Sequence, residues 1–296
     1  MSLKILNNVK LSDYTSWLVG GEAEYFCLPE TLEDLQEALY YAKEKKLPIT
    51  VFGGGSNILI SDQGISGLTI CLRRFSKITT NIDGNRLIIE ATSGVAKSEL
   101  LKIFLKNKLA PALFLAGLPG DVGGGVVMNA GVAEMFKPRE FMELVDWIDV
   151  LTVDGDMRRL QKADLKISYR HTDGWQPHIV VNVGMSWSME QDETILTQVR
   201  EANKTRLTKQ PLDMPSCGSV FKNPEGYKAA QLIDQCGLKG FRIGDAQVSL
   251  KHANFIVNLD QAKASDVWSV ITHVQRTVEN LKGVKLVTEV VRLGNW

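Results

Sequence analysis

Glycine is concentrated in one segment of this chain, and that concentration limits how the segment folds. Residues 116–131 read Ala-Gly-Leu-Pro-Gly-Asp-Val-Gly-Gly-Gly-Val-Val-Met-Asn-Ala-Gly, with six glycines in sixteen positions. Glycine loses more conformational freedom on folding than any other residue, so the composition argues against a helix interior or a plain strand. We therefore predict a loop whose main chain approaches another group closely.

A second glycine run lies nearer the N-terminus. A capping-box pattern at Thr31 and Asp34 predicts a helix to Lys46, and residues 48–52 predict a buried strand that leads into the run. The run consists of Gly53, Gly54, Gly55, Ser56 and Asn57. Main-chain N–H groups of consecutive glycines can hold an anion, and the alternative is a tight structural turn.

The two glycine segments together favour one kind of cofactor. Neither G-x-G-x-x-G after a strand nor G-x-x-x-x-G-K-[ST] occurs, so the two common nucleotide signatures are absent. A large flat cofactor with a pyrophosphate would use both segments, and a flavin dinucleotide fits that demand better than a mononucleotide does.

Bulk properties exclude several classes of function. The 34 basic and 34 acidic residues balance, which disfavours nucleic acid as a partner. No apolar run approaches the roughly 20 residues that span a bilayer, so no membrane association is expected. The cysteines are scattered and suggest neither disulfides nor a metal site, which fits a reducing cytoplasm. They are Cys27, Cys71, Cys217 and Cys236.

Hydrophobic periodicity predicts the remaining elements, and the length of 296 residues suggests about two domains. In the first two thirds we expect strands at 86–91 and 179–187, helices at 97–107 and 188–206, and a hairpin over 148–160 turning at Asp154-Gly155. The polar residues 208–211 predict a domain junction. Beyond them we expect helices at 227–236 and from 267 to 281, and strands at 254–258 and 284–293.

Three polar features are candidates for chemistry. Arg170, beside Tyr169, offers a permanent charge and a planar fork for a carboxylate or phosphate, although a solvated surface arginine is commoner. Glu289 lies in a predicted strand whose alternation puts it with Val287 and Val291, where it is either a raised-pKa acid or an exposed glutamate. The segment 215–224 sets polar side chains between two prolines, as a site loop or a surface turn would.

These segments, in this order and spacing, resemble the UDP-N-acetylenolpyruvoylglucosamine reductase family, MurB. The resemblance runs nearly end to end. Its anchors are residues 15–17 and 19–21, Gly53-Gly54-Gly55-Ser56-Asn57, residues 116–120 and 128–131, Tyr169-Arg170, residues 218–224, residues 251–255 and Glu289-Val290.

The resemblance implies an α+β fold. An FAD-binding region of the vanillyl-alcohol-oxidase (PCMH) type would form two subdomains, at residues 1–70 and 71–205. A MurB-type α+β substrate domain would follow at residues 206–296. The short separation of Arg170 from Ser219 leaves no room for the tyrosine-bearing loop of one branch, so the chain resembles the shorter, second type of the family.

The resemblance also implies a reaction of peptidoglycan synthesis. NADPH reduces FAD, hydride then passes to C3 of the enolpyruvyl group of UDP-GlcNAc-enolpyruvate, and protonation at C2 gives UDP-N-acetylmuramate. Arg170 and Glu289 match positions that stabilise the enolate, and Ser219 matches the proton donor to C2. These three are the implied catalytic residues, and no metal takes part.

The same matching assigns binding roles. The cofactor-binding residues would be Gly53, Gly54, Gly55, Ser56, Asn57, Gly117, Pro119, Gly120, Gly123, Asn129 and Gly131. The substrate-binding residues would be Tyr169, Lys222, Asn223 and His252. The chain departs from the family at Asp121, where a hydroxyl residue is usual, at residues 132–136, and at Cys217, where alanine is customary.

Two rival functions follow from the same residues. One is another FAD-dependent oxidoreductase of the same cofactor fold, which would lack the Gly218-Ser219 and Glu289-Val290 pairs. The other is a flavin- or nucleotide-sugar-binding protein without catalysis, against which the joint presence of Ser219, Arg170 and Glu289 argues.

Overall fold

The chain divides into two compact units, each assembled from segments far apart in the sequence. The computed structural model describes residues 3–132 and 138–296. Unit 1 comprises Met1–Ile5, Phe26–Gly54 and Leu68–Lys204, and unit 2 comprises Leu6–Tyr25, Gly55–Gly67 and Thr205–Trp296. Each unit has a hydrophobic core of its own.

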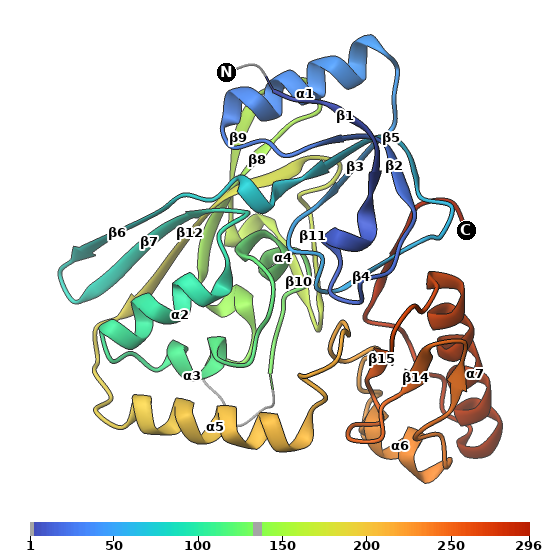
Figure 1. The fold of residues 1–296 in the computed structure, drawn as a ribbon. Helices are drawn as coiled ribbons and strands as arrows, with labels where there is room; N and C mark the ends of the chain where they lie inside the picture. The colour runs from blue at the N-terminus through green and yellow to red at the C-terminus, as the bar shows by residue number, and fades with distance from the viewer. Residues whose placement is uncertain (1–2, 133–137) are drawn as a thin grey trace. The chain divides into compact units, whose positions relative to one another are not determined.

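An antiparallel sheet of five strands in the order β6-β7-β12-β8-β9 is the centre of unit 1 (Figure 1). The strands are β6 (Ile78–Asp83), β7 (Arg86–Thr92), β8 (Val145–Leu151), β9 (Met157–Gln161) and β12 (Ile179–Ser188). The predicted hairpin is confirmed, because β8 and β9 pair directly and Gly155 adopts a φ of 92° in the turn between them. The predicted strands at 86–91 and 179–187 are confirmed as β7 and β12.

Three helices pack against this sheet in the core of unit 1. They are α2 (Lys97–Lys106), α3 (Pro111–Leu115) and α4 (Val122–Val127). Leu100 and Phe104 of α2 are almost fully buried and join the same core as Val183 and Met185 of β12. The helix predicted at 97–107 is therefore confirmed as α2.

The expectation that residues 116–131 contain no helix is wrong, because α4 includes three consecutive glycines. A Cβ on Gly123 would lie 2.6 Å from Cβ of Ser93, and one on Gly125 would lie 2.9 Å from the ring of Phe141. The helix packs too closely on its neighbours for larger residues. Tertiary contact thus outweighs the low helix propensity of glycine.

The N-terminal part of unit 1 contains α1 (Leu32–Glu44), β3 (Ile49–Phe52) and the end of β5 (Ile65–Cys71). The predicted capping box of α1 is confirmed by reciprocal hydrogen bonds between Thr31 and Asp34. β3 pairs in parallel with β5, which confirms the strand, but only its last residue, Phe52, is buried, so the prediction that the strand is buried is wrong for the rest of it.

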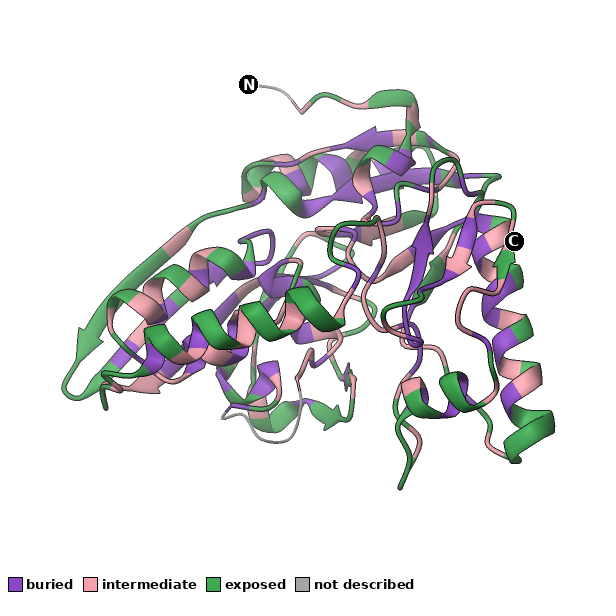
Figure 2. Ribbon diagram, turned by 60° about the horizontal axis from the view of Figure 1, so that its bottom comes forward, coloured by how far each residue is buried: buried purple, intermediate pink, exposed green. Residues whose placement is uncertain are grey.

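The helix predicted over residues 188–206 begins later and ends later than expected. α5 spans Ile195–Lys209, and β12 continues through Ser188. α5 buries only Ile195 and Val199, and its surface is mostly exposed (Figure 2). Residues 208 and 209 of the predicted junction therefore lie in its last turn.

The core of unit 2 is built from α6, α7 and a three-stranded sheet. The elements are α6 (Ala229–Gln235), β13 (Arg242–Ile243), β14 (Ala246–Val248), β15 (Ile256–Asn258) and α7 (Ala264–Lys282). One face of α7 is buried and the other exposed (Figure 2), as its apolar periodicity predicts. Leu281 is an exception, since it is 64% exposed.

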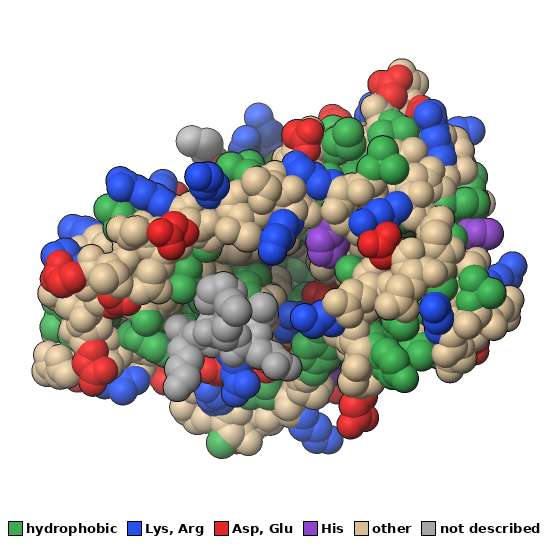
Figure 3. Space-filling view, turned by 90° about the horizontal axis from the view of Figure 1, so that it is seen from below, with side chains coloured by type: hydrophobic (Ala, Val, Ile, Leu, Met, Phe, Trp, Pro, Cys, Tyr) green, Lys and Arg blue, Asp and Glu red, His purple; other side chains and the backbone are tan. Residues whose placement is uncertain are grey.

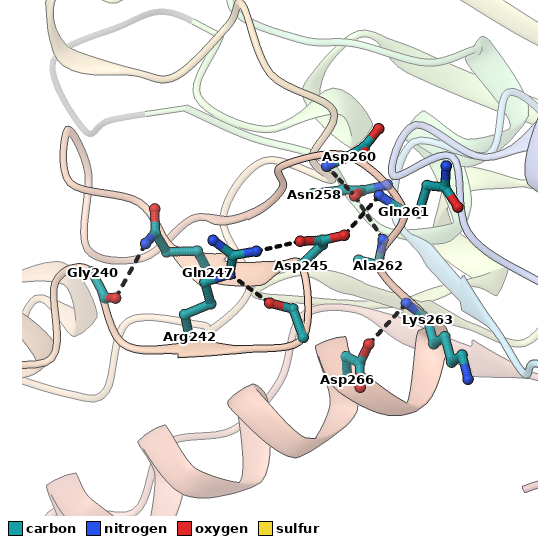
Figure 4. Close-up of polar contacts among 11 residues, drawn as sticks. Gly240, Arg242, Asp245, Gln247, Asn258, Asp260, Gln261, Ala262, Lys263 and Asp266 are labelled. Atoms are coloured by element: carbon teal, nitrogen blue, oxygen red, sulfur yellow. Dashed lines mark hydrogen bonds and ion pairs between the residues drawn. The ribbon is translucent and has the colours of Figure 1, made fainter.

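Side-chain hydrogen bonds hold the turns that lead into α7 (Figure 4). Asn258 accepts from the N–H groups of Asp260 and Ala262, at 3.1 and 3.0 Å. Asp245 accepts from Arg242 and from the N–H of Gln261. The bonds from Asp260, Gln261 and Ala262 satisfy main-chain donors of the turn that precedes α7.

The C-terminal segment is less regular than predicted. Only β16 (Val291–Leu293) is a strand, and it pairs in parallel with β4 (Ile58–Ile60). The predicted strand over 284–293 is therefore mostly wrong. The predicted helix over 227–236 is wrong at its start, because α6 begins at Ala229. α6 ends at Gln235, and Gly237, two residues further on, has a φ of 69°, as the predicted glycine cap requires.

The other elements are short. They are β1 (Leu6–Lys10), β2 (Glu22–Cys27), β10 (Lys166–Ser168), β11 (His171–Asp173) and the 3-10 turns at Leu11–Tyr14, Leu72–Arg74, Phe141–Glu143 and Lys162–Asp164. Lysine and arginine side chains are interspersed with aspartate and glutamate on the face in Figure 3. Among the described residues, no helix has both the length and the apolarity that crossing a membrane requires.

Candidate functional site

Two glycine segments of unit 1 meet at Asp121. Its Oδ2 accepts a hydrogen bond from the N–H of Gly54 at 2.5 Å, and its Oδ1 accepts from the N–H of Gly124 at 2.9 Å. A Cβ on Gly53 would lie 2.0 Å from Oδ2. We call Gly53-Gly54 together with residues 119–125 the cradle.

The cradle has the properties that a pyrophosphate-bearing cofactor needs. Its glycine N–H groups already hold an oxyanion, which in this structure is a carboxylate of the chain itself. Beside Gly123, the hydroxyl of Ser93 is buried and has no hydrogen-bond partner among the described residues. A buried polar atom of this kind is normally satisfied, so the chemistry of the cradle fits a polar ligand such as FAD.

Lys97 is buried beside the cradle, and no sequence motif indicated it. Its side chain is 3% exposed, and its Nζ donates to the carbonyl of Pro119 at 2.8 Å. Burial lowers the pKa of Lys97 to about 8, and the charge of Asp121 opposes that shift. The main-chain N–H of Lys97 also donates to the carbonyl of Gly120, so α2 fixes the turn on which the cradle depends.

Gly117 stands between α3 and α4, outside the contacts of Asp121. A Cβ there would lie 3.2 Å from Cγ1 of Val132, which is a tight but not forbidden contact. Of the departures predicted at residues 132–136, positions 133–136 lie outside the described residues.

Asn129 and Arg170 are linked through Glu140, a residue that no sequence signal indicated. Asn129 is fully buried and donates to Oε2 of Glu140 at 2.8 Å and to the carbonyl of Ser168 at 3.0 Å. Arg170 donates to the carbonyl of Gly131 at 2.9 Å and lies 3.7 Å from Oε1 of Glu140. Of the residues predicted to bind the cofactor, Gly131 thus bonds directly to Arg170, and Asn129 is linked to Arg170 through Glu140.

The turn that carries Arg170 holds it in an uncommon conformation. β10 and β11 pair antiparallel, and Tyr169-Arg170 is the two-residue connection between them. Arg170 has a φ of 57°, and its side chain is only 11% exposed. The centre of the Tyr169 ring lies 4.7 Å from the guanidinium. Because the Arg170 side chain is mostly buried, the alternative of an arginine solvated at the surface is excluded.

In unit 2, Asn57 and Glu289 are brought together from opposite ends of the chain. The side-chain amide of Asn57 donates to the carbonyl of Glu289 at 3.0 Å, and the N–H of Val291 donates to the carbonyl of Asn57. Before them, Gly55 fits closely against Tyr14, whose carbonyl would be 1.9 Å from a Cβ at that position. Ser56 is half-buried in the same turn.

The segment that carries Ser219 joins the same cluster. The N–H of Glu289 donates to the carbonyl of Val220 at 2.8 Å, and the N–H of Val220 donates to the carbonyl of Asn254. The buried side chain of Asn254 also bonds both the N–H and the carbonyl of Phe221. Asn254 therefore fixes the Ser219 segment, a role that its own sequence context did not indicate.

Of the two alternatives for Glu289, the apolar buried face is wrong. Val287 and Val291, with which the alternation groups it, are 55% and 41% exposed, whereas Leu286 and Val290 are buried. The chain is irregular here because it bridges to Phe221 only at Thr288 before it reaches β16. Glu289 is half-buried beside the Ser219 segment instead.

Cys217 is buried next to this cluster. Burial, with the nearby charge of Glu289 as a second cause, raises the pKa of its thiol well above the ordinary value. Its side chain is therefore a neutral thiol at physiological pH. A nucleophilic thiolate is excluded by the same argument.

The three substrate candidates of unit 2 have different surroundings. Lys222 donates its main-chain N–H to the carbonyl of Val287, while Asn223 is exposed and its Oδ1 accepts from the N–H of Ala229 at the start of α6. The Nδ1 of His252 accepts from the N–H of Asn254, and burial lowers the pKa of this histidine. His252 is thus a neutral imidazole near pH 7.

Comparison with known proteins places the chain in a class and then in a family. Residues 23–161 match the family described as FAD binding domain, and residues 210–293 match the family described as UDP-N-acetylenolpyruvoylglucosamine reductase, C-terminal domain. The chain is therefore a flavoprotein in which an FAD-binding region precedes a second domain. The predicted α+β fold of this kind is confirmed.

Curated relatives extend the match over nearly the whole chain. UDP-N-acetylenolpyruvoylglucosamine reductase of Listeria monocytogenes serotype 4a is 40% identical over 97% of this chain and 94% of its own length. The reductase of Pediococcus pentosaceus is 38% identical over 99% and 95%. The crystal structure of the Thermus caldophilus reductase (MurB) shares 32% identity with a TM-score of 0.79, covering 99% of both chains. This chain belongs to the UDP-N-acetylenolpyruvoylglucosamine reductase family.

Proposed function

We propose that this chain reduces the enolpyruvyl ether of UDP-GlcNAc-enolpyruvate to UDP-N-acetylmuramate, with NADPH as the electron source and FAD as the carrier, in the cytoplasm. The observation that carries the proposal is the cluster of Asn57, Glu289 and Val220 in unit 2, where Val220 directly follows Ser219, together with the family match. When bound, the flavin supplies hydride transfer, a step that no side chain of the protein can perform.

The charge that develops on the substrate assigns the roles of Arg170 and Glu289. Hydride addition at C3 of the enolpyruvyl group leaves negative charge delocalised between C2 and the carboxylate. Arg170 supplies fixed positive charge, held in place by Gly131 and Glu140. Glu289 supplies a hydrogen bond to the enolate. Preorganised groups of this kind lower the barrier because they need no reorganisation during the reaction.

Ser219 then donates its proton to C2. A serine hydroxyl is a weak acid, so it can act only against a strongly basic carbon and from a fixed position. The hydrogen bonds of Val220 to Glu289 and to Asn254 support that fixed position. Gly53 to Asn57, Gly117, Pro119, Gly120, Gly123, Asn129 and Gly131 contact the cofactor, and Tyr169, Lys222, Asn223 and His252 contact the substrate.

Anaerobic half-reactions test this assignment. Flavin bleaching by NADPH reports the first half, and re-oxidation by UDP-GlcNAc-enolpyruvate reports the second. Ser219→Ala should keep the first half and slow the second by two or more orders of magnitude, as expected for loss of a general acid (about 10²–10⁴-fold). Ser216→Ala, in the same segment, is the matched control and should leave both halves unchanged.

The rival functions give different outcomes in the same experiment. Another flavin oxidoreductase would be bleached by its donor but not re-oxidised by the enolpyruvyl substrate. A non-catalytic binding protein would bind ligands without either colour change. Near-normal re-oxidation of Ser219→Ala would remove Ser219 from its role.

A further inference from the structure

The Asp121 carboxylate uses the same N–H groups that an anionic cofactor would need. It bridges the N–H of Gly54 and the N–H of Gly124, one from each side of the cradle. Its side chain also fills the space beside Gly53 into which no Cβ would fit. Asp121 thus holds the two glycine segments together as a bound anion would.

The position of Asp121 is fixed from both sides. The N–H of Lys97 donates to the carbonyl of Gly120 at 3.0 Å, and the N–H of Val122 donates to the carbonyl of Val95 at 2.8 Å. With the main chain held on either side, only a rotation of the Asp121 side chain could move the carboxylate out of the cradle.

Two basic side chains lie at the cradle. Lys97 is buried near Asp121, and the guanidinium of Arg73 donates to the carbonyl of Gly54 at 3.1 Å. Asp121 itself is only 5% exposed. Each oxygen of this buried carboxylate accepts one main-chain N–H, so both oxygens are hydrogen-bonded without any ligand.

We propose that the Asp121 carboxylate competes with the FAD pyrophosphate for the N–H groups of Gly54 and Gly124. The carboxylate thereby stabilises the cradle when no cofactor is bound and lowers the affinity of the chain for FAD. The inference rests on the proposed use of the cradle for FAD. A pyrophosphate that takes the N–H groups of Gly54 and Gly124 must displace the carboxylate or lie against it. Like charges a few ångströms apart in a partly buried site repel by more than the free energy of a tenfold change in affinity. A hydroxyl at this position would carry no such charge.

The test compares wild type, Asp121→Asn and Asp121→Ser as full-length chains freed of flavin. Titration calorimetry measures Kd for three probes, FAD, ADP and riboflavin, and thermal unfolding measures Tm without ligand. Both variants should bind FAD and ADP at least about tenfold more tightly than wild type. Riboflavin, which has no phosphate, should bind with an unchanged Kd, and Tm without ligand should fall by several degrees because a bridging cap is weakened.

Asp34→Asn is the matched control. Asp34 is also a capping carboxylate of unit 1, with hydrogen bonds to the N–H groups of Glu30 and Thr31. This variant should lower Tm without changing the Kd for FAD or ADP.

Each other outcome has a defined meaning. Unchanged or weaker FAD and ADP binding by the Asp121 variants would overturn the proposal and leave Asp121 as a structural cap. Equal tightening for riboflavin would also overturn it, because competition would not then be with phosphate. If wild type and both variants all fail to bind FAD, the proposed function fails, and with it the basis of this inference. Two substitutions are used so that one poorly folded variant does not decide the result.

Discussion

The side-chain amide of Asn57 donates a 3.0 Å hydrogen bond to the main-chain carbonyl of Glu289. The two residues are 232 positions apart in the chain. The bond ties the end of the first glycine run to the residue proposed to stabilise the enolate. Since the N–H of the same Glu289 is bonded to Val220, its backbone is fixed on both sides.

Asn57→Ala should therefore weaken catalysis more than it weakens the fold. Loss of one hydrogen bond costs about 1 kcal/mol of unfolding free energy. We expect re-oxidation by substrate to slow by about tenfold if the freed Glu289 backbone loses a similar free energy in the transition state. Asn107→Ala removes a comparable amide bond, to the carbonyl of Ile103 at 2.9 Å, and should cost stability alone. Equal kinetic losses in both variants would contradict the proposed link.

Glu140→Gln should impair the reaction through Arg170. Glutamine keeps an oxygen for the amide of Asn129 but removes the charge that faces the guanidinium at 3.7 Å. We expect a several-fold fall in kcat with little change in Tm, measured by steady-state kinetics and thermal unfolding. Glu193→Gln is the control, because Glu193 pairs with Lys108 at an exposed site where ion pairs contribute about 0–1 kcal/mol. A normal kcat for Glu140→Gln would show that the charge of Glu140 is not needed to position Arg170.

Lys97 should make stability depend on pH in the alkaline range. Its pKa is lowered from 10.5 to about 8 in the folded protein. Between these values the unfolded chain binds more protons than the folded chain, so the unfolding free energy rises with pH. The unfolding free energy rises by at most about 1.4 kcal/mol per pH unit. It does not rise below the pKa that Lys97 has in the folded protein.

Urea unfolding of wild type and Lys97→Met from pH 7 to pH 10.5 measures this dependence. The difference between the two proteins should be constant below about pH 8 and should shift in favour of wild type above it. Lys102→Met, at a solvent-exposed position of α2, is the control for removing a lysine from this helix. If Lys97→Met and Lys102→Met show the same pH dependence, Lys97 does not titrate as stated.

Cys217 should resist alkylation and tolerate replacement. Its buried thiol has a raised pKa, so iodoacetamide at pH 8 should label Cys236, which is partly exposed, well before Cys217. Mass spectrometry of timed samples checks the order of labelling. Cys217→Ala should keep nearly normal half-reactions, because hydride transfer to an enol ether needs no thiol. Rapid labelling of Cys217 in the folded protein would contradict its burial.

Local patterns were sufficient for elements whose signals lie within a few residues of one another. The capping box at Thr31 and Asp34 predicts the start of α1, and the apolar spacing from Val267 to Val278 predicts the buried face of α7. The site residues could be predicted only from the order and spacing of many motifs, each of which is weak alone. Glu140 lies in no such motif, and Asn254, although it lies in the anchor at residues 251–255, had no predicted role of its own, because the partners of both residues lie in other segments of the chain.

Motif order and hydrophobic patterning are enough to predict the family, the α+β class and the close main-chain approach at the glycine segments. They do not predict that Gly123 to Gly125 form a helix turn, that Asp121 accepts from the N–H of Gly54, or that Asn57 bonds to Glu289. These three features share one cause. Helix propensity and strand alternation act over a few residues, whereas close packing against Ser93 or Phe141, and hydrogen bonds to distant carbonyls, act between segments that meet only when the chain folds.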